Sequence, residues 1–170
     1  MIDATTSPSR LWKRMTAEQR LRAAQALWRE PEAAAEQRQA AQLIAQQRKF
    51  RLKTVLGLDD ERKARYLASL PDLAEALASR VLVLYHLAEQ RPMMGTFLDA
   101  LGIGHDNGLI HEDTVAPDPA KLAAAVRTVA ETYPADDVAL YLNTLLWQDP
   151  ASWSALLTVS ETTGKEADAR

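Results

Sequence analysis

Proline placement is the feature that most constrains the fold of this 170-residue chain. A proline is tolerated in the first turn of an α-helix, because its missing N–H would have no partner there, and it disrupts the helix interior. Seven of the eight prolines stand where a helical pattern begins: Pro8, Pro31, Pro71, Pro92, Pro119, Pro134 and Pro150. The sequence therefore predicts a chain of successive helices rather than strands.

Residue composition and helix caps agree with this prediction. Alanine, the strongest helix former, accounts for 30 residues, and only six residues are glycine. Thr16 and Gln19 have the spacing of a capping box, while Asp59, Asp118 and Asp149 precede other expected helix starts. The expected helices span residues 8–14, 17–30, 31–48, 60–69, 71–90, 92–102, 119–132, 134–148 and 150–159, with a short turn expected near 51–57.

These observations predict an all-α fold, a compact single-domain bundle of about 7–9 helices without a sheet. The apolar residues of 71–90 cover almost the full circumference of a helix, so this segment is expected to be buried at the centre. Leu77, Val81, Leu84 and Ala88 are its expected core residues. The domain is expected to cover 1–160, followed by a flexible tail at 161–170.

Composition excludes several classes of function. The chain has no cysteine, so it has no disulfide, thiol nucleophile or iron–sulfur cluster. No apolar run approaches the roughly 18 residues of a membrane span, and no secretory signal is recognisable at the N-terminus. We expect a cytoplasmic protein that does not contact a membrane and holds no cofactor.

Charge is distributed unevenly along the chain. Residues 1–66 carry 14 Lys/Arg and 8 Asp/Glu, whereas residues 67–170 carry 6 and 15. The densest basic run is Arg48, Lys49, Arg51 and Lys53, with Phe50 inside it. Such a run can neutralise phosphates while the aromatic ring stacks on a base. The favoured interpretation is that these charges face the acidic second half or form solvated helix faces, and that Phe50, Leu52, Val55 and Leu56 pack inward.

A second candidate site lies in the non-helical stretch 102–117. It contains His105, Asp106, His111, Glu112 and Asp113, which are possible metal ligands, and His86 could join them from the preceding helix. A metal-dependent hydrolase is therefore one alternative. The favoured interpretation is structural: Asp-Asn-Gly at 106–108 is typical of a tight turn, and Leu109 and Ile110 fix the loop to the core.

The functional hypothesis is a non-catalytic helical protein that binds another protein or a second copy of itself. It follows from the lack of a recognisable catalytic motif, and from the Gln-rich helix at 31–48, whose alanine stripe would let another helix approach closely. The alternatives are the metal-dependent hydrolase and nucleic-acid binding through the basic half; we do not expect nucleic acid to be the partner.

Overall fold

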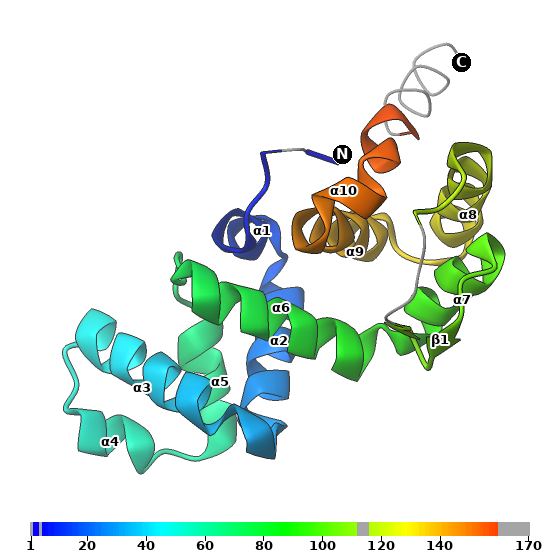
Figure 1. Cartoon of the computed structure of the whole chain (residues 1–170). Coiled ribbons are helices and arrows are strands. Elements are labelled where there is room, and N and C mark those ends of the chain that lie inside the picture. Colours follow the sequence, from blue (N-terminus) through cyan, green and yellow to red (C-terminus); the bar gives the residue numbers. More distant parts are fainter. Residues whose placement is uncertain (1, 4, 112–115, 160–170) are drawn as a thin grey trace. The chain divides into compact units, whose positions relative to one another are not determined.

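The computed structural model describes residues 2–3, 5–111 and 116–159, and about 75% of these residues are helical. The predicted all-α fold is confirmed (Figure 1). The elements are α1 (Pro8–Arg14), α2 (Ala17–Arg29), the 3₁₀ turn η1 (Pro31–Ala33), α3 (Ala34–Arg48), α4 (Leu52–Leu56), α5 (Asp60–Ala68), α6 (Glu75–Glu89), α7 (Arg91–Leu101), β1 (His105–Asp106), β2 (Leu109–Ile110), α8 (Pro119–Thr132), α9 (Ala135–Gln148) and α10 (Pro150–Trp153).

The chain divides into two compact units. The N-terminal unit is Ser7–Glu89, and the C-terminal unit combines Met1–Thr6 with Gln90–Arg170. The expectation of one domain over 1–160 stays a prediction, and the expected tail at 161–170 lies outside the described residues. The units differ in charge: the N-terminal unit carries 15 Lys/Arg and 10 Asp/Glu, whereas the C-terminal unit carries 5 and 13.

The predicted helix caps are present. The Thr16 hydroxyl accepts a hydrogen bond from the Gln19 amide at 3.1 Å, and the Gln19 side chain accepts one from the Thr16 amide at 2.9 Å. The side chains of Asp59, Asp118 and Asp149 likewise accept hydrogen bonds from backbone amides in the first turns of α5, α8 and α10. Each cap satisfies amides that have no partner within the helix, which stabilises it by about 1 kcal/mol.

The predicted helix start at Pro71 is wrong, because α6 begins at Glu75. Residues 70–75 are instead bound to α1 and its N-cap. The Leu70 carbonyl accepts a hydrogen bond from the Trp12 indole at 3.0 Å, and Asp72 pairs with Lys13 at 2.5 Å. The Glu75 carboxylate accepts from the hydroxyls of Ser7 and Ser9 at 2.9 and 2.6 Å, and the Ser9 hydroxyl lowers the pKa of Glu75 below its ordinary value.

Within the N-terminal unit, α2 packs against α5 and α6, α1 packs against α6, and α3 packs against α4, α5 and α6. Other helices of this chain cover the alanine stripe of α3, since Ala40 and Ala41 are fully buried. Leu77, Val81 and Leu84 of α6 are buried as predicted, but the prediction for Ala88 is wrong because it is exposed. A central position for α6 in the whole molecule stays a prediction.

In the C-terminal unit, α7 packs against α8, and α9 contacts α8 and α10. The Phe97 ring of α7 is fully buried and meets the Tyr141 ring of α9 edge to face, with 5.6 Å between centroids. The ring of Trp153 in α10 also contacts Phe97, with 6.0 Å between the ring centroids. The Asp3 amide donates a hydrogen bond to Asn143 of α9 at 3.0 Å, which attaches the N-terminal segment to this unit.

A two-stranded hairpin contradicts the expectation that the fold has no sheet. His105 pairs with Ile110 and Asp106 with Leu109, in antiparallel register. Asn107 and Gly108 form the turn with φ values of 49° and 90°, so the predicted turn at these residues is confirmed. Two consecutive positive φ values give the backbone the twist that a two-residue hairpin requires.

Gly108→Ala is expected to destabilise the C-terminal unit by about 1–3 kcal/mol. The added Cβ would lie 2.9 Å from Met94 Cβ, on a residue whose φ is 90°. Asn107→Gly is the matched control, because glycine accepts a φ of 49° freely and the free energy of unfolding should change by less than about 0.5 kcal/mol. Urea denaturation measures both, and equal values for the two variants would show that the turn geometry is different.

Candidate binding surface

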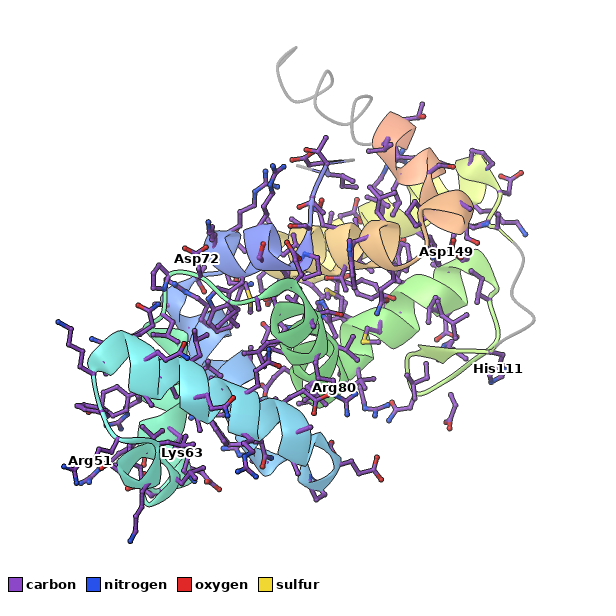
Figure 2. All side chains as sticks on the ribbon, turned by 60° about the vertical axis from the view of Figure 1, so that its left-hand side comes forward. Arg51, Lys63, Asp72, Arg80, His111 and Asp149 are labelled. Atoms are coloured by element: carbon purple, nitrogen blue, oxygen red, sulfur yellow. The ribbon has the colours of Figure 1, made fainter. Side chains whose placement is uncertain are left out.

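The basic run lies at the junction of α3 and α4. α3 ends at Arg48, and Lys49 closes it in the left-handed conformation with a φ of 56°. Arg51 then begins α4. Arg48, Lys49, Phe50, Arg51, Lys53 and Leu56 are all exposed, and we call these six residues the basic surface. Figure 2 shows Arg51 at the periphery of the N-terminal unit.

The basic surface lies in a stretch of sequence that carries positive charge only. Residues 37–58 contain five Lys/Arg and no Asp/Glu. Among the described residues, Lys49, Arg51 and Lys53 form no ion pair. Other cations of the same unit are paired, as Lys63 is with Asp60 at 3.1 Å. Lys63 also lies 5.3 Å from the centre of the Trp28 ring, so its charge is compensated locally.

Two residues of the basic surface, Phe50 and Arg48, contact the ring of Tyr66 in α5. The rings of Phe50 and Tyr66 of α5 meet at an angle of 82°, with 5.6 Å between centroids. The Arg48 guanidinium lies 5.8 Å from the centre of the Tyr66 ring and donates a hydrogen bond to the Ser69 hydroxyl at 2.5 Å. That hydroxyl donates to the Tyr66 carbonyl at 2.7 Å. Arg48 therefore connects the end of α3 to α5 and its C-cap Ser69.

The expectation that Phe50 and Leu56 pack inward is wrong. Phe50 is 39% exposed and Leu56 is 47% exposed, whereas Val55 is fully buried. α4 has only five residues, and successive helix positions differ by about 100°, so a helix that directs Val55 inward directs Leu56 away from the core. The expectation that the basic residues face the acidic half stays a prediction. Sequence reasoning also missed Tyr66 and Ser69, which lie too far along the chain for spacing to indicate contact.

His105 has structural partners at both ring nitrogens. Its Nδ1 accepts a hydrogen bond from the Gly108 amide at 3.0 Å, and its Nε2 lies 3.2 Å from an Asp99 carboxylate oxygen. A neutral imidazole with its proton on Nε2 makes both interactions. A metal ion could bind His105 only by displacing one of these two interactions. In the structure this residue therefore stabilises the hairpin.

Three of the other candidate metal ligands, His86, Asp106 and His111, lie among the described residues. His111 continues the hairpin, and its amide donates to the Gly104 carbonyl at 3.3 Å. Asp106 is exposed on β1, and the buried His86 belongs to the N-terminal unit. Glu112 and Asp113 lie outside the described residues. Within 2–3, 5–111 and 116–159, no group of three His, Cys, Asp or Glu residues is arranged to hold a metal ion.

The comparisons with known proteins give no further assignment. No protein-family model matches the chain, and neither a curated protein nor a solved structure matches it. In the part of the chain that the structure describes, none of the helices has the length and apolarity to cross a membrane.

Proposed function

We propose that this protein acts without catalysis, by binding another protein through the basic surface. The observation that carries the proposal is the exposure of Phe50 and Leu56 beside Lys49, Arg51 and Lys53, three cations without an ion pair among the described residues. A few well-packed residues near the centre of an interface supply much of the binding energy, and the surrounding charges set partner choice and association rate.

A protein partner fits these side chains better than nucleic acid does. Proteins that bind single strands stack successive bases on several aromatic rings. Phe50 is the one exposed residue among the described Phe, Tyr and Trp residues, and Arg48 lies over the ring of its neighbour Tyr66. Leu56, which is aliphatic, gains stability by contact with another apolar group and offers a nucleic acid no hydrogen bond.

The proposal is tested by reversing charge on the basic surface. Arg51→Glu with Lys53→Glu should reduce recovery of the specific partner at least about tenfold in a quantitative affinity capture, which corresponds to 1.4 kcal/mol. Both residues are exposed, and glutamate is compatible with the N-terminus of α4, so the fold should be unchanged. Circular dichroism of the purified variant checks this.

The matched control makes the same change of charge in the other unit. Lys121 and Arg127 are exposed on α8, and Lys121→Glu with Arg127→Glu alters net charge equally. This variant should recover the partner as the unaltered protein does. If both double variants lose the partner to the same extent, binding depends on overall charge and the basic surface has no specific role.

A further inference from the structure

We infer that the partner contacts the basic surface with an acidic segment that also carries large apolar side chains. This inference rests on the proposed function and adds the chemistry of the partner. Its starting point is the arrangement of α4, where Lys53 and Leu56 are three residues apart and therefore lie on the same face of the helix. Arg51 is the N-cap of α4, and Phe50 is the residue before it.

A contact that covers Leu56 must also cover the cation beside it. Removing a charged group from water without a partner costs several kcal/mol, which exceeds the gain from burying one leucine side chain. Within residues 37–58 the chain supplies no carboxylate to compensate Arg51 or Lys53. Among the described residues no carboxylate pairs with Arg51 or Lys53, so a partner that covers them supplies the carboxylates itself, beside the apolar groups that contact Phe50 and Leu56.

The same arrangement disfavours partner segments of other composition. A neutral apolar segment would bury the cations unpaired, and a basic segment would add repulsion, so the cations select against both. A segment with acidic residues alone would leave Phe50 and Leu56 partly in contact with water. The two features of the surface together specify acidic and apolar side chains in one segment.

Phosphate-bearing partners are the competing possibilities. An anionic lipid bilayer also offers negative charge next to apolar groups, but the helix that would enter it has five residues and presents Leu56 as its exposed apolar side chain. Membrane-surface helices bury a much longer apolar face. Nucleic acid is disfavoured by the single exposed aromatic ring, as described above.

The test measures binding of fluorescent synthetic peptides by anisotropy at about 150 mM salt. The first peptide has leucine and phenylalanine residues flanked by glutamates. In the second, serine replaces the apolar residues, and in the third, lysine replaces the glutamates. We expect the first peptide to bind at least about tenfold more tightly than the other two. Its affinity should fall with increasing salt, and should fall about tenfold in the Arg51→Glu, Lys53→Glu variant.

A second pair of variants tests the apolar contribution. Leu56→Ala should weaken binding of the first peptide, whereas Leu109→Ala should not, although both leucines are 47% exposed. A single-stranded oligonucleotide and vesicles of anionic lipid are tested in the same way. Equal binding of the first two peptides, tighter binding of the oligonucleotide or the vesicles, or failure of every probe to bind would overturn the inference. The affinity capture with Arg51→Glu, Lys53→Glu separately decides whether the proposed function fails.

Discussion

Phe97→Ala is expected to lower the free energy of unfolding by about 3–5 kcal/mol. The ring is fully buried and contacts both Tyr141 and Trp153, so its removal leaves a cavity where α7, α9 and α10 are connected. Domains of this size are stable by only about 5–15 kcal/mol, so the loss is a large fraction of the total. Urea denaturation followed by far-UV circular dichroism measures it.

Leu109→Ala is the control for this prediction, because its side chain is 47% exposed. Its replacement should change stability by less than about 1 kcal/mol. If Phe97→Ala costs no more than Leu109→Ala, the aromatic cluster of the C-terminal unit does not stabilise the fold as described.

Trp12→Ala is expected to destabilise the N-terminal unit by a similar amount, about 3–5 kcal/mol. Trp12 lies on a helix of only seven residues, yet it is fully buried and its indole donates to the Leu70 carbonyl at 3.0 Å. Its loss removes apolar contacts and one of the hydrogen bonds that attach residues 70–75 to α1. The same denaturation measurement applies.

Trp12→Phe separates these two contributions. Phenylalanine retains an aromatic ring in the core but cannot donate to Leu70, and an unsatisfied buried carbonyl costs about 1–3 kcal/mol. The variant should therefore lie between the unaltered protein and Trp12→Ala. A cost as large as that of Trp12→Ala would mean that packing of the indole contributes little, contrary to its complete burial.

Local signals predicted most of the helix boundaries. Thr16, Asp59, Asp118 and Asp149 cap their helices because capping depends on residues within one turn. Pro71 has another local signal of a helix start, the proline itself, but the Leu70 carbonyl and the residues that follow are held by α1. Contacts between residues roughly sixty positions apart are not visible in a local pattern, which is why the start of α6 was predicted too early.

Residue patterns predicted less of the candidate site. The basic run and the Asn107-Gly108 turn are evident in the sequence, since each depends on adjacent residues. The exposure of Phe50 and Leu56 is not, because the short apolar pattern over residues 50–56 satisfies an inward-facing arrangement equally well. Phe50 contacts Tyr66 of α5, and Arg48 contacts Tyr66 and Ser69, through tertiary packing that a local pattern does not show.

Photo-cross-linking from position 50 tests most directly the claim that the basic surface binds a protein. An aromatic photo-reactive amino acid replaces Phe50 in one protein and Leu109, an exposed residue of the C-terminal unit, in another. On illumination in cells, we expect a discrete protein adduct from position 50. It should disappear when Arg51→Glu and Lys53→Glu are added, and position 109 should not give it. An adduct that forms equally from both positions, that survives charge reversal, or that fails to form at position 50 would contradict the account.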